Sequence, residues 1–486
     1  MRVAPLVRVL QRAASTTARR SLPQASIRRN VHATASAGSA LGGIDGVNPF
    51  HVSSKQLQPG IPRSEFRQRR EQLLENLPEN TALIVHAATT KYMTHDIPYE
   101  FRQNSNFMYL TGLEEPDALA VFLKTAQTSS FVLFVRPRDA HSEQWDGARV
   151  GVDGAKERYG ADDAFQLSDM DKQMATLLGG MQQVFVLSPE QGRYPNEFLR
   201  ATQPFHDKFF AGDVLVEQLR LIKSENELNR MRYAGDIAVG GFLEMMTKTR
   251  AGMTELALAA EFEAHSKRNG ALWTSFPCVV GSGANAAVIH YLSKRNVLQP
   301  TDLVLVDSGC EVPGYYVSDI TRTWPVTSSA ALSAAQRDLY ELTLDVQKQC
   351  LTHLQQQLST GQSITLDQLH AFASHELTRG LRSFGILSAT STTRDLHRYN
   401  PTHIGHYLGM DVHDTSHISR SVPLRPGMVI TVEPGVYLPQ HDASLPKEFR
   451  GIGIRIEDDV IIKDGGIEIT TSRLPKELSD IDALRE

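Results

Sequence analysis

The sequence is organised around the stretch Asp302-Leu-Val-Leu-Val-Asp-Ser-Gly-Cys-Glu-Val-Pro-Gly-Tyr-Tyr-Val-Ser-Asp-Ile-Thr-Arg-Thr-Trp-Pro325. Its apolar start predicts a buried strand that ends at Asp307, and the Gly and Pro residues that follow predict a turn. A β-rich run then leads to Asp319, so we expect a hairpin with one carboxylate on each arm. Two close carboxylates repel each other unless a cation lies between them. Asp307 and Asp319 therefore form half of a predicted metal site, and the alternative is one turn Asp and one capping Asp.

Three later stretches each end a strand-like run on a side chain of a metal-binding type. A carboxylate in an apolar strand is costly to bury without a cation or hydrogen-bond donors. The first stretch supplies histidines and the other two supply Glu433 and Glu457; the stretches are residues 401–414, 427–437 and 451–459. Two Asp, two Glu and one His exceed the needs of one divalent ion and fit a pair of ions with a water between them. This ligand set favours Mn²⁺, with Zn²⁺ and Co²⁺ as alternatives.

Five motifs in the expected order resemble those of the pita-bread metallopeptidases, the group of aminopeptidase P, prolidase and methionine aminopeptidase. The phrases closest to the aminopeptidase P branch are Ser318–Pro325, His406–Asp414, Val432–Gly435 and Gly453–Asp458. The resemblance implies a hydrolase that binds two divalent metal ions through Asp307, Asp319, His406, Glu433 and Glu457. His406 is preferred to His403 as the ligand because only His406 precedes the expected Tyr-Leu-Gly.

The resemblance also implies roles for residues beside the metals. Glu433 is expected to take and return a proton while it remains a ligand. His290 and His413 are expected to stabilise the oxyanion and to bind the substrate carbonyl. Taken alone, His290 would more often be a packed core histidine. Arg455 shares a strand face with Glu457, where it either orients a carboxylate ligand or forms a structural ion pair.

This sequence departs from the family pattern at three places. Asp307 and Asp319 are twelve residues apart, whereas the family usually has eleven, so we expect the extra residue to bulge at the hairpin tip. A shift of register would instead turn Asp319 to the wrong face. Thr402 stands where the family commonly has a histidine, with His403 beside it. Phe276, expected in the substrate site, stands where many relatives have a tyrosine.

Four further acids near the motifs are expected to be turn or surface groups rather than ligands: Asp411, Asp414, Asp458 and Asp459.

The chain is expected to be an α+β protein with two structured domains. Strand-like and helical runs alternate over residues 63–215 and predict a smaller N-terminal α/β domain, with an amphipathic helix at 161–178. Residues 216–475 are expected to form the catalytic pita-bread domain, a curved antiparallel sheet flanked by helices, in two similar halves. Capping boxes predict helix starts at Ser224, Ser333 and Thr365. Residues 41–62 are expected to be a linker and 476–486 a tail.

Residues 1–40 have a composition of their own. They are rich in Arg, Ser and Ala, and the first acidic residue of the chain is Asp45. This is typical of a mitochondrial transit peptide, and a basic tail is the alternative. With this leader, the resemblance is closest to the mitochondrial X-Pro aminopeptidase or intermediate-cleaving subfamily, in the matrix or associated with the inner membrane.

Composition excludes several classes of function. The formal net charge is −5, which argues against nucleic acid as a partner. No apolar run reaches the roughly 20 residues of a membrane span, and three scattered cysteines do not indicate a disulfide framework. The expected substrate is the N-terminus of a peptide or protein, and the resemblance implies a homo-oligomer, a dimer or tetramer. The alternatives are a prolidase that cuts X-Pro dipeptides and a non-catalytic pita-bread binding scaffold.

Overall fold

The computed structural model of the chain describes residue 48 and residues 50–189 and 194–485. The predicted leader, residues 1–40, lies outside these residues. Within the described ranges, none of the helices combines the length and the apolar composition needed to cross a bilayer.

The helices and strands are as follows. The N-terminal part contains β1 (Gln56–Gln58), β2 (Ile61–Pro62), α1 (Arg63–Asn76), β3 (Thr81–His86), α2 (Ser105–Thr111), β4 (Leu119–Lys124), β5 (Ser129–Val135), α3 (Ala140–Asp146), α4 (Gly151–Glu157), β6 (Asp163–Gln166), α5 (Met170–Leu178), β7 (Gln183–Val186), α6 (Asn196–Thr202), β8 (Phe209–Ala211) and α7 (Asp213–Leu221). The C-terminal part contains α8 (Glu225–Lys248), α9 (Glu255–Arg268), β9 (Trp273–Thr274), β10 (Val279–Ser282), β11 (Leu303–Ser308), β12 (Cys310–Val312), β13 (Tyr316–Val317), β14 (Ile320–Pro325), α10 (Ala334–Ser359), α11 (Leu366–Ser383), α12 (Thr393–Leu396), β15 (Val429–Val432), β16 (Gly435–Leu438), β17 (Ile452–Arg455), β18 (Asp458–Lys463), β19 (Gly466–Ile469) and α13 (Leu478–Ala483).

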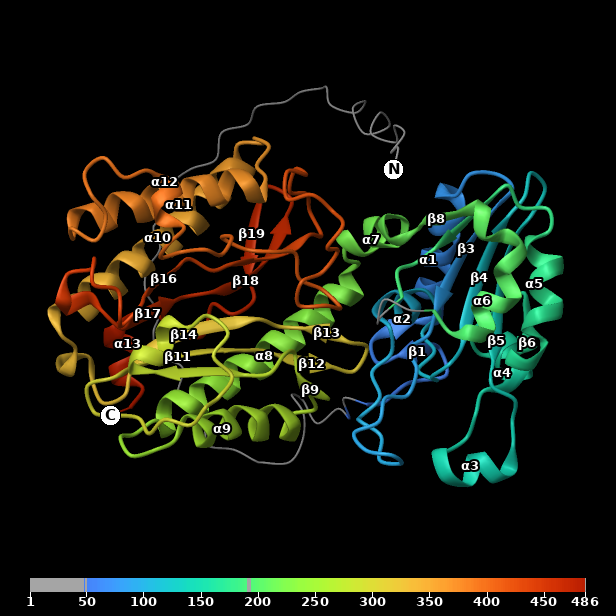
Figure 1. Cartoon of the computed structure of the whole chain (residues 1–486), viewed down its shortest axis with the longest axis horizontal. Helices are drawn as coiled ribbons and strands as arrows, with labels where there is room; N and C mark the ends of the chain where they lie inside the picture. Colours follow the sequence, from blue (N-terminus) through green and yellow to red (C-terminus); the bar gives the residue numbers. More distant parts are fainter. Residues whose placement is uncertain (1–47, 49, 190–193, 486) are drawn as a thin grey trace. The chain divides into compact units, whose positions relative to one another are not determined.

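The N-terminal part is built on a mixed sheet with the strand order β6-β5-β4-β3-β7-β8 (Figure 1). Strand β3 pairs antiparallel with β4 and parallel with β7. Successive side chains of a strand point to opposite faces, and the buried residues of β3 accordingly enter two cores. Leu83 packs in the core that contains α1 and α2 residues, and Ile84 in the core that contains α5 and α6 residues. The predicted α/β layering is therefore present, with helices on both faces of the sheet.

The C-terminal part repeats one arrangement twice. Helices α8 and α9 precede the strands β9 to β14, and helices α10 and α11 precede the strands β15 to β19. In Figure 1 the two helix pairs lie on either side of the strands. The strands form small antiparallel sheets, which include β10-β11-β14 and β15-β18-β19. The two halves meet where the Arg455 backbone N–H donates to Thr323 Oγ1 at 3.2 Å, and where the Glu457 N–H donates to the Thr321 carbonyl at 3.0 Å.

The hairpin that carries the two aspartates brings them to one cavity. Strand β11 pairs with β14 so that Asp307 lies opposite Thr321. Asp319 lies directly before β14, two residues before Thr321, and it lines the same cavity as Asp307. The pairing of β12 with β13 leaves Pro313, Gly314 and Tyr315 at the tip, where Gly314 and Tyr315 have positive φ angles of 93° and 69°. The longer spacing is thus accommodated at the tip, as expected, and the register is not shifted.

All three predicted capping boxes are present. The side chains of Ser224, Ser333 and Thr365 each accept a hydrogen bond from the backbone three residues later, and the Glu or Gln at that position bonds back. These caps begin α8, α10 and α11. Local sequence therefore sets where the long helices of the catalytic half begin.

Local predictions differ from the structure in three segments. The expected linker contains the paired strands β1 and β2. The expected tail contains α13, whose Ile481 is fully buried. The helix predicted over 161–178 is wrong in its first half, where residues 163–166 form β6 and pair with β5. Strand pairing in the sheet overrides local helical periodicity there.

Candidate metal centre

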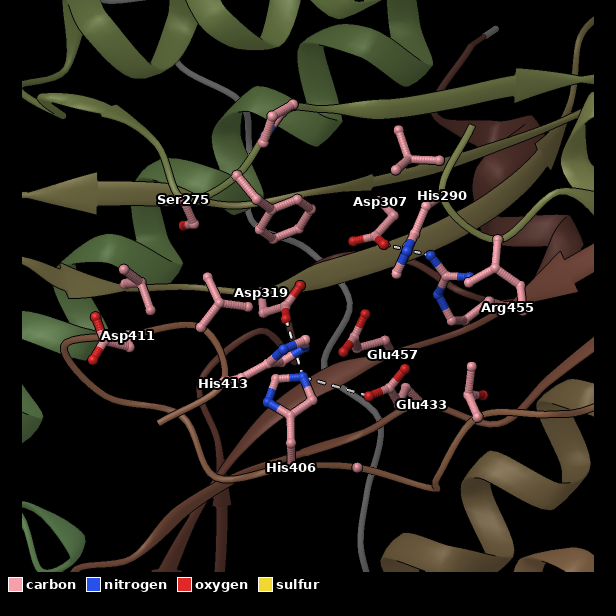
Figure 2. Close-up of a pocket in the computed structure, with 18 of the residues that line it drawn as sticks. Ser275, His290, Asp307, Asp319, His406, Asp411, His413, Glu433, Arg455 and Glu457 are labelled. Atoms are coloured by element: carbon pink, nitrogen blue, oxygen red, sulfur yellow. Dashed lines mark hydrogen bonds and ion pairs between the residues drawn. The ribbon is translucent and has the colours of Figure 1, made fainter. Parts of the chain in front are cut away.

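The predicted site residues line a single cavity of about 650 Å³. The metal-type residues Asp307, Asp319, His406, Glu433 and Glu457 all lie on its wall, together with Phe276, His290, His413 and Arg455. They come from separate places in the chain and are brought together by the folding of the two halves onto each other (Figure 2). The structure thus brings all nine of these predicted site residues to one cavity.

Three of these side chains converge most closely. One potential ligand atom from each of Asp319, His406 and Glu457 lies within 4.8 Å of the others, and all three residues are buried. Glu433 Oε1 lies 3.5 Å from His406 Nε2, and Asp319 Oδ2 lies 3.3 Å from the same nitrogen. Carboxylate oxygens around one imidazole nitrogen are the donor set of a divalent metal site.

The backbone orients the His406 ring for such a role. Its Nδ1 lies 3.1 Å from the carbonyl oxygen of Tyr407, so Nδ1 carries the proton and Nε2 presents a lone pair to Asp319 and Glu433. A ligand histidine usually has its second nitrogen fixed in this way. Thr431 Oγ1 accepts from the His406 N–H at 3.2 Å and donates to Glu433 Oε1 at 3.2 Å. One hydroxyl therefore aligns both residues.

A second hydroxyl aligns the other side of the site. Thr321 Oγ1 donates to Glu457 Oε2 at 2.6 Å and accepts from Arg455 Nε at 2.8 Å. Arg455 Nη2 donates to Asp307 Oδ2, and its Nη1 donates to Tyr437 Oη at 2.6 Å. Arg455 was expected either to form a structural ion pair or to orient a carboxylate. The two interpretations are compatible, because its ion pair with Asp307 also orients that carboxylate.

The carboxylates are crowded enough to need a cation. Burial and the neighbouring Asp307 raise the pKa of Asp319 well above its usual range, and burial with Asp319 does the same to the pKa of Glu457. Burial also raises the pKa of Glu433. Asp307 Oδ1 is buried without a hydrogen-bond partner among the described residues. Bound metal ions would offset the repulsion between these carboxylates and would give the unpaired Asp307 oxygen a partner. The residues present therefore fit a metal centre.

His290, His413 and Phe276 line the same cavity. The rings of His413 and His406 meet edge to face, with centroids 4.6 Å apart. Burial, then His406 and His290, lowers the pKa of His413, so this ring is neutral near pH 7 and retains one N–H to donate. His290 and His413 are both exposed at the cavity surface, where a substrate carbonyl has access to them.

The four acids that were expected at turns or the surface are mostly buried, so that expectation is wrong for three of them. Asp458 pairs with Arg322 at 2.7 Å and with Lys476 at 2.6 Å. Asp459 Oδ2 accepts from the backbone N–H of Asp319 at 3.1 Å, and Asp414 accepts from Lys223 at 2.9 Å. Asp411 alone remains partly exposed, at 39% of its side chain. Their partners lie far away in sequence, so the polarity of the neighbouring residues wrongly indicated that these acids are exposed.

Thr402 and His403 also line the cavity. The His403 ring stacks on His370 with centroids 4.3 Å apart, and its Nδ1 lies 2.9 Å from the Gly405 carbonyl. Burial and His370 lower the pKa of His403 to about 4. His403 is thus turned toward α11, away from the carboxylate group around His406, which agrees with the preference for His406.

Sequence reasoning missed the residues that support the ligands. Thr321 had a detectable signal, because it lies two residues after Asp319 in the sequence. Thr431 had a similar signal, because it lies two residues before Glu433. Arg102, which also lines the cavity, had none, because it comes from the N-terminal domain and reaches Glu311 across 209 residues of sequence.

Comparison with known proteins agrees with this geometry. Residues 229–464 match Metallopeptidase family M24, and residues 66–186 match the Aminopeptidase P, N-terminal domain. The chain is 40% identical over 444 residues to the Intermediate cleaving peptidase 55, mitochondrial, of Arabidopsis thaliana, which covers 90% of this chain and 86% of that protein. The chain belongs to the aminopeptidase P family of M24 metallopeptidases.

Other members of the aminopeptidase P family match over similar lengths. Xaa-Pro aminopeptidase 3 of Homo sapiens is 34% identical over 90% of this chain and 89% of its own. The solved structure of aminopeptidase P from E. coli is 34% identical, covers 87% of this chain and 98% of its own, and superimposes with a TM-score of 0.78. A zinc-substituted form of the E. coli enzyme superimposes with a TM-score of 0.79.

The family assignment confirms two predictions. The fold is an aminopeptidase P N-terminal α/β domain followed by a pita-bread metallopeptidase domain. The protein is a metallo-aminopeptidase of the Xaa-Pro aminopeptidase type, acting on peptides.

Proposed function

We propose that this protein is a dinuclear-metal aminopeptidase that removes the N-terminal residue from X-Pro peptides or from mitochondrial proteins whose presequence has been removed. The observation that carries the proposal is the convergence of Asp319, His406 and Glu457 within 4.8 Å of one another, with Asp307 and Glu433 on the same cavity wall. Manganese is the proposed metal, since oxygen ligands predominate.

The five residues are proposed to hold two divalent ions, which would polarise the substrate carbonyl and make a water nucleophilic near neutral pH. The residues themselves have separate tasks. Thr431 and Thr321 hold Glu433 and Glu457 in place, and Arg455 holds Asp307. Because these donors are fixed before substrate arrives, little reorganisation is needed during the reaction.

Glu433 is the proposed proton carrier. Its Oε1 lies 3.5 Å from His406 Nε2 and accepts a hydrogen bond from Thr431 Oγ1 at 3.2 Å, so the carboxylate is oriented toward the proposed ligands. It is placed to take a proton from the attacking water and to return it to the leaving amine nitrogen of the second residue. His413 and His290 line the same space, where a ring N–H donated to the carbonyl oxygen would stabilise the negative charge that develops there.

Two features support a mitochondrial role. The leader-like composition of residues 1–40 predicts import, and a relative that is 40% identical is named as a mitochondrial intermediate cleaving peptidase. We propose that imported proteins are the substrates in this compartment, with X-Pro peptides as the alternative. The assembly into a dimer or tetramer, and the division of the chain near residue 215, stay predictions.

The test is a product analysis with matched peptides. A purified enzyme loaded with Mn²⁺ is given an X-Pro-Y tripeptide, the X-Pro dipeptide, and a tripeptide without proline. Release of the first residue from the tripeptides, lost on chelation, is the expected result. Strong preference for the dipeptide would instead identify a prolidase. The ratio between the two tripeptides decides whether proline is required.

Two controls separate catalysis from scaffolding. The variant Asp319→Asn should release no residue although it folds, because one ligand carboxylate is gone. Metal analysis of the wild type should find close to two ions per chain. Less than one ion per chain, with intact peptides after incubation, would favour the non-catalytic scaffold. Unchanged N-termini of matrix proteins in cells that lack this gene would contradict the mitochondrial substrate.

A further inference from the structure

The loop that carries His413 has no regular secondary structure. Residues 408–414 contain neither helix nor strand, although the Asp414 N–H closes the loop by donating to the Tyr407 carbonyl at 2.9 Å. Without the ladder bonds of a strand, a loop keeps one conformation only where side chains fix it.

The His413 ring is not fixed by bonds of its own. Within the described ranges it makes no hydrogen bond or ion pair, and its contact with the His406 ring is edge to face, with centroids 4.6 Å apart. The ring is exposed at the cavity surface. Its position therefore depends on the residues that hold the loop on either side of it.

Two acids flank His413 in the loop. Asp411 comes two residues before it and Asp414 directly after it. In Figure 2 the Asp411 carboxylate points away from the metal-type residues, whereas the His413 ring points toward them. The acids are thus free to anchor the loop from outside while the ring faces the substrate space.

The first anchor, Asp411, is held by the N-terminal part of the chain. Ser105 Oγ, in the first turn of α2, donates to Asp411 Oδ1 at 2.6 Å. Arg102 Nη2 donates to the same oxygen at 3.3 Å and to the neighbouring Met410 carbonyl at 2.8 Å. Both donors lie about 300 residues away from the loop in sequence, at separations of 306 and 309 residues.

Arg220 on α7 holds both anchors at once. Its Nη2 donates to Asp411 Oδ2 at 2.6 Å and also to Asp414 Oδ1. Its Nη1 donates to Asn106 Oδ1 on α2 at 2.7 Å, and the side chain is only 4% exposed. The planar fork of a guanidinium fixes the directions of several acceptors together, so Arg220 sets the spacing of the two acids around His413.

The second anchor, Asp414, is buried with its partners. Lys223 Nζ donates to Asp414 Oδ2 at 2.9 Å, and both side chains are almost fully buried. Removing one partner from a buried ion pair is strongly destabilising. The loop therefore leaves this arrangement only at a high cost.

The metal-type residues have separate supports. Thr321, Thr431 and Arg455 orient the carboxylates of the site. In the described part of the chain, no hydrogen bond joins these three supports to Asp411 or Asp414. A change in the bonds of Arg220 should therefore move His413 and leave metal binding intact.

We propose that the N-terminal part of the chain positions His413 for the reaction, with Arg220, Ser105 and Arg102 as positioning residues. This inference rests on the proposed function, in which His413 donates to the substrate carbonyl oxygen. A donor stabilises the developing negative charge only from the correct place, and a displacement of about 1 Å costs up to about 100-fold in rate. The N-terminal part thus supports catalysis without supplying a metal ligand.

The experiment is a double-mutant cycle between Arg220 and His413. Arg220→Lys keeps the charge, but one ammonium group does not reproduce the fork that joins Asn106, Asp411 and Asp414. The kcat/KM for one X-Pro-Y tripeptide is measured with the metal-loaded full-length wild type, Arg220→Lys, His413→Ala and the double variant. Bound Mn²⁺ per chain is measured on the same preparations.

Arg220→Lys should lower kcat/KM by about tenfold or more, and His413→Ala should lower it by about 100–1,000-fold. In the His413→Ala background, Arg220→Lys should lower it by less than about twofold, because residues that act through one group are not additive. Bound Mn²⁺ per chain should be the same in all four proteins.

Two further variants complete the test. Ser105→Ala removes a single hydroxyl, so it replaces Arg220→Lys if that variant does not fold; its loss should be smaller and should also disappear in His413→Ala. Arg232→Lys is the matched control, since Arg232 pairs with Glu468 at 2.6 Å and with Glu225 at 2.6 Å away from the cavity lining. Its kcat/KM should equal that of the parent in both backgrounds.

The outcomes separate the inference from the proposed function. An equal loss in both backgrounds would show a general structural effect and overturn the inference, as would unchanged kcat/KM in the two N-terminal variants or a parallel loss of Mn²⁺. Full activity of His413→Ala, or no residue release by the wild type, would overturn the proposed function instead.

Discussion

At the scale of single residues, the centre depends on side chains that do not themselves carry the chemistry. Arg455 is buried and bonds to Asp307, Thr321 and Tyr437. Thr321, which accepts a hydrogen bond from Arg455, in turn donates one to Glu457 and so orients its carboxylate. Buried networks of this kind are rigid only when each member is satisfied, so a loss at one position should spread to two ligands.

The first prediction concerns Arg455. In Arg455→Lys the bond to Asp307 can be kept, but the bonds to Thr321 and Tyr437 cannot all be made by one ammonium group. We expect metal affinity to fall by about 10–100-fold, as for other residues that support ligands. Isothermal titration of metal-free protein with Mn²⁺ measures this. The control is Arg232→Lys, and equal affinity in wild type and Arg455→Lys would contradict the role.

The second prediction concerns Glu311 and pH. Burial raises its pKa in the folded protein to about 7, compared with about 4.3 in an unfolded chain. A raised folded pKa means that the folded state binds the proton more tightly, so the stabilisation present below about pH 4 is lost as the pH rises through 7. Each pKa unit corresponds to about 1.4 kcal/mol.

The variant Glu311→Gln lacks this titration. The difference in Tm between Glu311→Gln and the wild type should therefore become more favourable to the variant between about pH 5 and pH 8. Thermal unfolding over that range, in one buffer series with the metal removed from both proteins, measures the difference. A constant difference across the range would show that Glu311 does not titrate there.

At the scale of elements, the hairpin from β11 to β14 decides whether the two aspartates meet. Gly309 lies against the backbone of Ser318, which belongs to the other arm of the hairpin. A Cβ on residue 309 would collide with the Ser318 carbonyl oxygen. The register of β11 against β14 places Asp307 opposite Thr321, and Asp307 and Asp319 line the same cavity. This arrangement requires a close backbone approach, which only glycine allows.

The third prediction is that Gly309→Ala disrupts this hairpin. Because the colliding atom is backbone, it cannot move aside as a flexible side chain would, and the cost should exceed the about 1–3 kcal/mol of ordinary overpacking. Chemical denaturation should show the loss of stability, and metal binding should weaken with it. The control is Gly180→Ala, where an added Cβ meets nothing within 4 Å. Equal stability of the two variants would contradict the close approach.

At the scale of the whole molecule, two halves and an N-terminal domain are held together at the site. The catalytic halves meet through β14 and β17, and the N-terminal domain reaches the cavity through Arg102. The proposed ligands come from both halves: Asp307 and Asp319 from one, and His406, Glu433 and Glu457 from the other. Metal ions bound between them should therefore add to the stability of the whole fold.

The fourth prediction is a metal-dependent Tm. Chelation should lower Tm and abolish residue release, and Mn²⁺ should restore both. The stabilisation expected at a free metal concentration of about one hundred times Kd is about 2.7 kcal/mol. Asp319→Asn should show a much smaller shift. A Tm that is independent of metal in the wild type would contradict binding between the halves.

Much of the site was predictable from local sequence. The aspartates, His406 and the two glutamates each stand in a short motif whose strand or turn is set by neighbouring residues, and the capping boxes at Ser224, Ser333 and Thr365 set three helix starts. The helix predicted over 161–178 failed because residues 163–166 pair with β5, a contact that local periodicity does not reveal.

The sequence by itself therefore determined the family and the starts of three long helices, and it predicted the residues that are proposed to bind metal, because these depend on short motifs. Only the tertiary structure decided that Asp458, Asp459 and Asp414 are buried partners of distant groups, and that Arg102 lines the cavity from another domain. The physical reason is that burial and ion pairing depend on which distant segments meet. The free energy of a charge is set by those neighbours rather than by its position in the chain.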